Sequence, residues 1–237
     1  MFRKKNIIEF ISIGEYYNNV ITDVPSPASK FIPQWWKDMQ PYVENKLKIH
    51  GHNSSATGKK CMPMFDAISS GYIIPLWADV MVVKTENGHS ASWKTQQPLF
   101  GVHDPRQSNG VEIPEGYSNS AFKYHNPWVI KTPPGWSCLI THPFGYPSLP
   151  FKMISAIVDT DIYPQDINPV FWIKKDFEGI IESGTPMVQI IPIKRSSWNS
   201  KFSSYTEEQH MYNQEKNIGK TIVNNYVKNI WQKKEYK

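Results

Sequence analysis

The sequence predicts a mainly β protein of sandwich or barrel type. Aromatic residues make up 14% of the chain and occur with 19 prolines and 13 glycines, a composition typical of β-rich, turn-rich domains. Short apolar runs bounded by Pro, Gly, Asn or Asp fill residues 122–195, and apolar residues recur at a helical period near the C-terminus. We therefore expect three parts: an N-terminal arm with a short helix packing on the core over 1–60, a β-domain over 61–200, and a C-terminal amphipathic helix over 201–237.

The composition also limits the class of protein. With 237 residues, 40% apolar and 20% charged, the chain can build a core, which excludes disorder throughout. No apolar run approaches the about 18 residues of a membrane helix, so we expect no membrane partner. Two cysteines, Cys61 and Cys138, cannot form a disulfide framework or a four-ligand metal site by themselves. We expect a reduced, intracellular protein without a metal.

The net charge of +5 suggests nucleic acid as a partner, but the kind of cation argues against it. Arginine is the side chain that best reads phosphates and guanine in a bidentate way, because its guanidinium is a planar fork of donors. Only Arg3, Arg106 and Arg195 are present, and the remaining basic residues are lysines. We therefore expect no nucleic-acid partner.

The N-terminal part predicts a strand followed by a proline-fixed segment. Residues 6–22 alternate weakly between apolar and polar and predict one strand or arm. Pro33 then precedes a short helix that contains Trp35 and Trp36. Neighbouring helical residues cannot both face one side, so we expect one tryptophan in the core. Residues 45–60 are polar and predict a loop.

The next sixty residues predict a helix, a long strand and a hairpin. Residues 61–70 form a short helix that ends at Gly71, because glycine adopts the left-handed conformation of a C′ residue. A long strand follows, interrupted at Pro75. Asn87-Gly88 lies between two alternating runs, the strongest local signal for a hairpin. Residues 98–120 are loop-like.

Two patterns complete the chain. The segments KYHNPWVIKT, GWSCLITHP, FKMISAIVDTD, NPVFWIKKD and TPMVQIIPIKR each predict a strand, and the absence of helical patterns between them predicts a sandwich or barrel. In the C-terminal part, Thr206 and Gln209 fit a capping box. The helical stripe that follows packs on the protein's own domain or on another chain, and it consists of Ile218, Ile222, Tyr226 and Ile230.

Candidate site residues lie in the segment VDTD. Asp159 and Asp161 alternate, so both carboxylates point to one face of a strand just before a turn at Pro164. Such a pair either solubilises an edge or caps a turn, or it holds a metal ion or a nucleotide. Cys138 and His142 share a strand face but stand too far apart for a nucleophile–base pair.

Two resemblances arise. The strings FIPQWWKDMQPY, GKKCMPMFDAISSGYIIPLWADV, NPWVIKTPPGWSCLITHP, VDTDIY and IESGTPMVQIIPIKR resemble a family of uncharacterised proteins of tailed bacteriophages and bacteria. This resemblance covers most of the chain and implies a phage or bacterial source but no activity. It therefore favours a phage protein located in the host cytoplasm or in the virion.

The second resemblance covers residues 125–195. The order IKTPPGWSCLITHP, ISAIVDTDIY, GIIESGTPMVQIIPI resembles the order of motifs in the dUTPase and dCTP-deaminase fold. Those enzymes are trimers of a β-clip, jelly-roll-like fold with the nucleotide between subunits. The resemblance implies a homo-oligomer, with a trimer favoured.

The resemblance places functional residues of that family one by one. Asp159 matches the aspartate that orients the attacking water, with Mg²⁺ on the phosphates, and Asp161 matches the second aspartate. Tyr163 falls one place after the position of the aromatic residue under the sugar, which is Ile162 here. Asp159 and Asp161 are the candidate catalytic residues of this alternative, and Mg²⁺ is required only by it.

The segment that should contact phosphate departs from the family. It is THPFGYPSLP, which has no arginine, so His142 is left as a poor substitute for a guanidinium. The candidate ligand-binding residues are therefore Tyr163, His142 and Trp136. Because the arginine donors of the phosphate motif are missing, we expect the fold of that family but no hydrolysis of the nucleotide.

The sequence thus favours a non-enzymatic phage structural or accessory protein that acts through oligomerisation or through a phage or host protein. One alternative is a nucleotide-binding or nucleotide-hydrolysing relative of the dUTPase fold. A second alternative is a metal-dependent oxygenase on a double-stranded β-helix, for which His103, Asp104 and either His142 or His210 supply the residue types.

Overall fold

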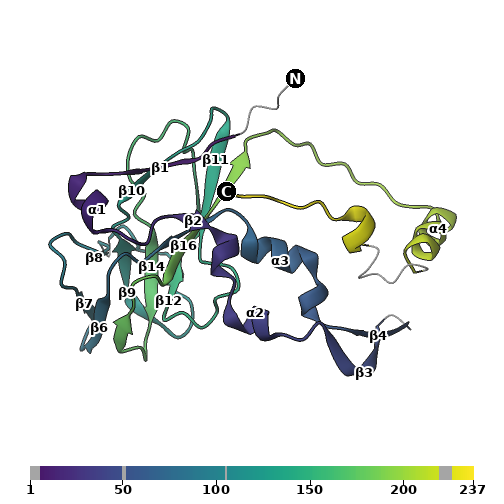
Figure 1. Cartoon of the computed structure of the whole chain (residues 1–237), viewed down its shortest axis with the longest axis horizontal. Helices are drawn as coiled ribbons and strands as arrows, with labels where there is room; N and C mark the ends of the chain where they lie inside the picture. The colour runs from purple at the N-terminus through teal and green to yellow at the C-terminus, as the bar shows by residue number, and fades with distance from the viewer. Residues whose placement is uncertain (1–5, 50–51, 105, 219–225) are drawn as a thin grey trace.

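A computed structural model describes residues 6–49, 52–104, 106–218 and 226–237 (Figure 1). The predicted class is confirmed in its coarse form, because the chain is mainly β and built from several antiparallel sheets. These sheets are open, and the described residues do not close into a barrel. No helix in these ranges has the length and apolar character needed to cross a membrane.

The largest sheet has five strands in the order β13-β11-β16-β5-β2. Its strands are β2 (Ser26–Pro27), β5 (Tyr72–Pro75), β11 (Trp136–Thr141), β13 (Ala156–Val158) and β16 (Pro186–Lys194). The pairing of β11 with both β13 and β16 brings the segment after β13 next to the end of β16. Polar side chains from these two segments therefore meet at one end of the sheet.

Three smaller groups of strands complete the β-domain. A four-stranded sheet has the order β12-β14-β9-β8, a three-stranded sheet has the order β15-β6-β7, and β1 pairs with β10. Their bounds are β1 (Glu9–Ser12), β6 (Val80–Thr85), β7 (Gly88–Ser92), β8 (Phe100–Val102), β9 (Tyr117–Tyr124), β10 (Trp128–Lys131), β12 (Phe151–Met153), β14 (Val170–Lys174) and β15 (Gly179–Ile181).

The two larger sheets share one hydrophobic core, which makes the architecture sandwich-like. Ile140 of β11 and Val188 of β16 are buried in the same cluster as Phe122, Phe151 and Phe171 of the four-stranded sheet. Phe171 lies at the centre of the aromatic packing, with ring centroids 5.9 Å from Phe122 and 5.7 Å from Phe151. Burying aromatic rings against one another supplies much of the apolar burial that stabilises such a domain.

The proline-fixed segment contacts a loop of the β-domain and helix α3 (Met62–Ser69). It forms η1 (Ala28–Phe31) and α2 (Gln34–Asp38), which begins directly after Pro33. Trp36 is 3% exposed, whereas Trp35 is more exposed and donates a hydrogen bond of 2.6 Å from its indole to the carbonyl of Gly145. One tryptophan therefore fills the core and its neighbour fixes the segment to a distant loop.

Helix α3 (Met62–Ser69) is attached to the large sheet by one buried amide. Gln189 of β16 is fully buried and donates to the carbonyls of Ala67 (3.1 Å) and Ser70 (2.6 Å), while its oxygen accepts from the backbone N–H of Phe144 (2.8 Å). The helix ends as predicted, because Gly71 has a φ of 69°. A Cβ there would lie 2.0 Å from the Ile190 carbonyl oxygen, so only glycine fits.

The hairpin at Asn87-Gly88 is confirmed by the pairing of β6 with β7, but three local expectations are wrong. Residues 45–60 are not a loop, because β3 (Tyr42–Ile49) pairs with β4 (His52–Ala56), and η2 (Gly58–Lys60) follows. Residues 6–22 are not one strand, because β1 ends before Gly14 and α1 (Glu15–Val20) follows. Residues 98–120 contain β8 and the start of β9.

A fourth local expectation is corrected at Pro75. The predicted single strand divides into β5 and β6, which belong to different sheets. Proline lacks the N–H that a ladder needs, so the chain leaves the sheet there instead of only bending. The five strands predicted between residues 122 and 195 are all present, although FKMISAIVDTD supplies two short strands, β12 and β13.

The C-terminal part leaves the β-domain and returns to it (Figure 1). After β16 the chain runs without regular structure to α4 (Glu207–Ile218), and η3 (Tyr226–Ile230) precedes the C-terminal tail. The capping box is confirmed by reciprocal hydrogen bonds between Thr206 and Gln209. Ile222 of the predicted stripe lies outside the described residues, and Ile230 is 55% exposed.

Candidate functional site

The two candidate aspartates meet one arginine at the end of the large sheet. Arg195 follows β16 directly, and its Nη1 lies 2.8 Å from Asp161 Oδ1 and 3.2 Å from Asp159 Oδ1. Its Nη2 pairs with the second oxygen of Asp161. Ser137 of β11 donates to Asp159 at 2.6 Å and accepts from Arg195 at 3.1 Å. We call these four residues the Asp–Arg cluster.

The electrostatics of the cluster keep the carboxylate of Asp161 ionised and paired. The side chain of Asp161 is 4% exposed, and it also accepts a hydrogen bond of 2.7 Å from the backbone N–H of Gly135. Hydrogen bonds from Arg195, with the Gly135 N–H as a smaller cause, lower the pKa of Asp161 to about 2. Asp159 is half exposed but has Ser137 and Arg195 as partners. Asp161 is therefore not poised as a free base near neutral pH.

A second, buried network lies beside the cluster. Thr132 and Thr160 share a hydrogen bond of 2.7 Å, and the Thr160 hydroxyl lies 3.3 Å from the sulfur of Cys138. Burial raises the pKa of the Cys138 thiol to about 11. Cys138 is therefore an inert core thiol, because a nucleophilic cysteine needs a stabilised thiolate.

The remaining candidate residues do not join the two aspartates in one site. His142 lies beyond the other end of β11, where Nε2 pairs with the Tyr146 carbonyl at 3.0 Å and Nδ1 accepts from the backbone of Met153 at 3.4 Å. Burial lowers the pKa of His142 and favours the neutral imidazole, while the hydrogen bond to the Tyr146 carbonyl acts in the opposite direction as a smaller cause. Tyr163 is 42% exposed, and only its backbone N–H contacts Asp159.

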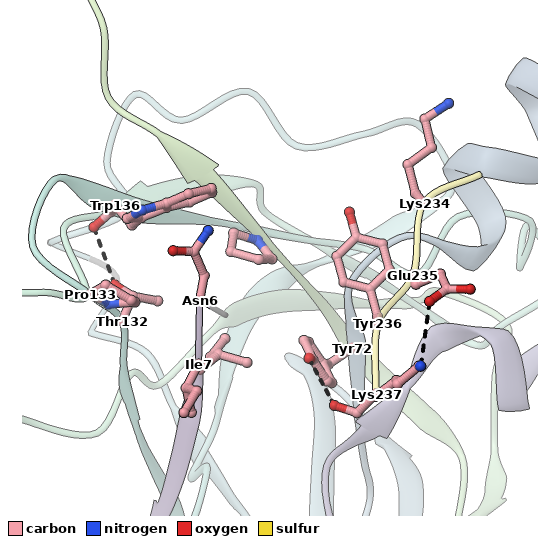
Figure 2. Close-up of a pocket in the computed structure, with 12 residues that line it drawn as sticks. Asn6, Ile7, Tyr72, Thr132, Pro133, Trp136, Lys234, Glu235, Tyr236 and Lys237 are labelled. Atoms are coloured by element: carbon pink, nitrogen blue, oxygen red, sulfur yellow. Dashed lines mark hydrogen bonds and ion pairs between the residues drawn. The ribbon is translucent and has the colours of Figure 1, made fainter. Parts of the chain in front are cut away.

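Trp136, the third candidate ligand-binding residue, lines a cleft of about 570 Å³ (Figure 2). Trp136 forms one wall with the turn that precedes β11, and the tyrosines of β5 and of the C-terminal tail lie opposite. The lining residues, which we call the aromatic cleft, are Asn6, Ile7, Ile8, Tyr72, Thr132, Pro133, Trp136, Pro192, Lys234, Glu235, Tyr236 and Lys237.

The C-terminal tail forms its wall of the cleft through specific contacts. Tyr236 packs edge-on against Tyr72, with ring centroids 5.9 Å apart, and the Tyr72 hydroxyl donates to the Lys237 carbonyl at 3.2 Å. Upstream, the indole of Trp231 donates to the carboxylate of Asp66 in α3 at 3.0 Å. The same carboxylate pairs with Lys234. Helix α3 therefore holds the tail in place beside β5.

Several polar groups of the cleft already have partners within the chain. Thr132 donates to the Trp136 carbonyl or pairs with Thr160, Tyr72 bonds the tail, and Glu235 pairs with Lys237 at 3.4 Å. What remains available is the apolar surface of the rings and prolines. Such a cleft suits an aromatic or aliphatic group better than a highly charged one.

Other motifs from the sequence give no metal centre. Asp104 forms an ion pair with Arg106 at 2.6 Å, which occupies the carboxylate expected for an oxygenase site. Across the described ranges, no three His, Cys, Asp or Glu side chains come together as a metal site would require. Sequence reasoning missed Arg195 as the partner of the aspartates, although its place directly after the last strand was a usable signal. It also missed the tail as a wall of the cleft.

Comparison of the chain with protein-family models, with curated proteins and with solved structures finds no match. Inferences about function therefore rest on the geometry of the chain itself.

Proposed function

We propose that this protein is a non-enzymatic structural or accessory protein that acts by oligomerisation through its C-terminal part. The observation that supports this proposal is the segment 196–206, which we call the aromatic arm. It has no helix or strand, and every residue from Lys194 to Tyr212 is exposed. Within it, Trp198 is 90% exposed, Phe202 96% and Tyr205 71%.

Three exposed aromatic side chains within eight residues are unusual for a surface segment without regular structure. Single exposed apolar residues are ordinary, but grouped ones mark contact surfaces, because burying each ring gives about 1.5–3 kcal/mol. Serines at 196, 197, 200, 203 and 204 keep the rest of the arm polar and adaptable. An arm of this kind binds by placing a few rings into pockets of a partner.

The Asp–Arg cluster gives less support to the nucleotide-hydrolysing alternative. Hydrolysis of a phosphoanhydride needs a carboxylate free to orient water and cationic donors free to meet the phosphates. Arg195 pairs with both oxygens of Asp161 and with one oxygen of Asp159, and the described loop that follows β11 carries His142 with both ring nitrogens engaged. We therefore keep the dUTPase-like resemblance as a proposal about fold and oligomerisation, and the resemblance to phage proteins as a proposal about location in the host cell or virion.

The test is the mass of the protein in solution. We expect light scattering at high micromolar concentration to give an oligomer for the wild-type chain. The variant Trp198→Ser, Phe202→Ser, Tyr205→Ser should give a monomer with an unchanged circular dichroism spectrum, because the arm lies outside the core.

The matched control changes three exposed aliphatic residues elsewhere, as Val102→Ser, Ile157→Ser, Ile162→Ser, whose exposed fractions are 62%, 65% and 74%. This control should keep the mass of the wild type. A wild-type monomer would refute oligomerisation, and an unchanged mass in the arm variant would refute the role of the arm.

A further inference from the structure

The aromatic arm begins at the wall of the aromatic cleft. The backbone N–H of Arg195 donates to the Gly135 carbonyl at 2.9 Å, and its Nη1 donates to the Trp136 carbonyl at 3.1 Å. Arg195, the residue directly before the arm, is therefore hydrogen-bonded to Trp136, which lines the cleft. From this point the chain runs away from the β-domain (Figure 1), and Trp198 is 90% exposed.

We propose that Trp198 of one chain docks into the aromatic cleft of a second copy, with the partner's arm making the equivalent contact. This inference rests on the proposed function and names both the partner and the receiving site. Trp136 and Tyr236 line the cleft from opposite sides, with Asn6 between them (Figure 2), and an indole that enters the cleft can contact these rings.

The positions of arm and cleft make an exchange between copies geometrically simple. Arg195, where the arm begins, and the cleft lie at the same edge of the protein. A rotation axis at that edge therefore places the start of each arm next to the cleft of the other copy. Trp198 is three positions after Arg195 in the chain, a span of roughly 10 Å when extended. No change in the β-domain is needed for the contact to form.

The area available agrees with a stable association. An aromatic side chain buries about 150–250 Å², so the rings of Trp198, Phe202 and Tyr205 from two chains supply about 900–1,500 Å² before their receiving surfaces are counted. Specific interfaces bury about 1,200–2,000 Å² in total. A reciprocal exchange of arms therefore reaches the range of a specific interface, whereas one indole alone does not.

The inference is tested by crosslinking two different variants after mixing. In a Cys61→Ser background, which removes the exposed native thiol, one chain carries Ser197→Cys next to the intact indole. The other carries Glu235→Cys at the border of the cleft. Under mild oxidation we expect a disulfide-linked heterodimer on a non-reducing gel, and we expect Trp198→Ala in the first chain to lower its yield at least tenfold.

Phe144→Ala is the matched control, because Phe144 is an exposed aromatic residue outside the arm and the cleft, and it should leave the yield unchanged. An equal yield of the crosslinked heterodimer with Trp198→Ala would overturn docking in the cleft. So would the absence of any heterodimer while the wild type is an oligomer. Both results would leave the proposed function intact. A disulfide formed only within a chain carrying both cysteines would also overturn it. A monomeric wild type would instead refute the proposed function itself.

Discussion

The buried amide of Gln189 is predicted to hold α3, and through it the C-terminal wall of the cleft, on the β-domain. Gln189→Leu keeps a similar volume but removes two donors and one acceptor. The carbonyls of Ala67 and Ser70 and the N–H of Phe144 then lose their partners. At about 1 kcal/mol for each net hydrogen bond, the expected loss of unfolding free energy is about 3 kcal/mol.

The assay is urea unfolding followed by tryptophan fluorescence, with thermal unfolding as a second measurement. For a chain of this length, a loss of about 3 kcal/mol lowers the melting temperature by roughly 6–12 °C. Gln107→Leu, at an exposed glutamine, is the control and should change the unfolding free energy by no more than about 0.5 kcal/mol. If Gln189→Leu is as stable as this control, the three hydrogen bonds do not join α3 to the sheet.

Two further predictions concern the Asp–Arg cluster and the N-terminal segment. The pKa of Asp161 is lower in the folded protein than in the unfolded chain, so the unfolded state binds the proton first and stability falls as the pH drops from about 4 toward 2. Asp161→Asn should remove this part of the acid dependence, so the unfolding free energies of variant and wild type should converge near pH 2. If the two curves of unfolding free energy against pH run parallel instead, the pairing of Asp161 with Arg195 is contradicted. Trp36→Ala should cost about 3–5 kcal/mol in urea unfolding because the ring is buried, and a loss no larger than that of Trp35→Ala would show that Trp36 is not the anchor.

Features with a local cause could be predicted from the sequence. The end of α3 and the β6–β7 hairpin depend on glycines in special backbone conformations, and Gly71 and Gly88 both have positive φ values. The burial of one of two adjacent tryptophans follows from helix geometry, and Trp36 is the buried one. In each case the signal and the structure lie within a few residues of one another.

Features that depend on distant partners could not be predicted in the same way. In the β3–β4 hairpin, β4 is almost entirely polar and β3 alternates only briefly at Leu47 and Ile49, so the apolar pattern was too short to reveal its strands. The contact between Arg195 and the two aspartates depends on the register of β11 with β16, in which Trp136 lies opposite Lys194. That register is fixed by which side chains enter the core, and the sequence alone does not state which strands are neighbours.

The Asp–Arg cluster and the aromatic arm are best understood together. Asp161 bonds both the guanidinium of Arg195 and the N–H of Gly135, whose carbonyl in turn accepts from the N–H of Arg195. These bonds fix the backbone of Arg195, from which the arm leaves the sheet. If the arm docks as proposed, a fixed root lowers the conformational entropy lost on binding. The two carboxylates, whose spacing suggests catalysis, thus have a structural role in holding Arg195.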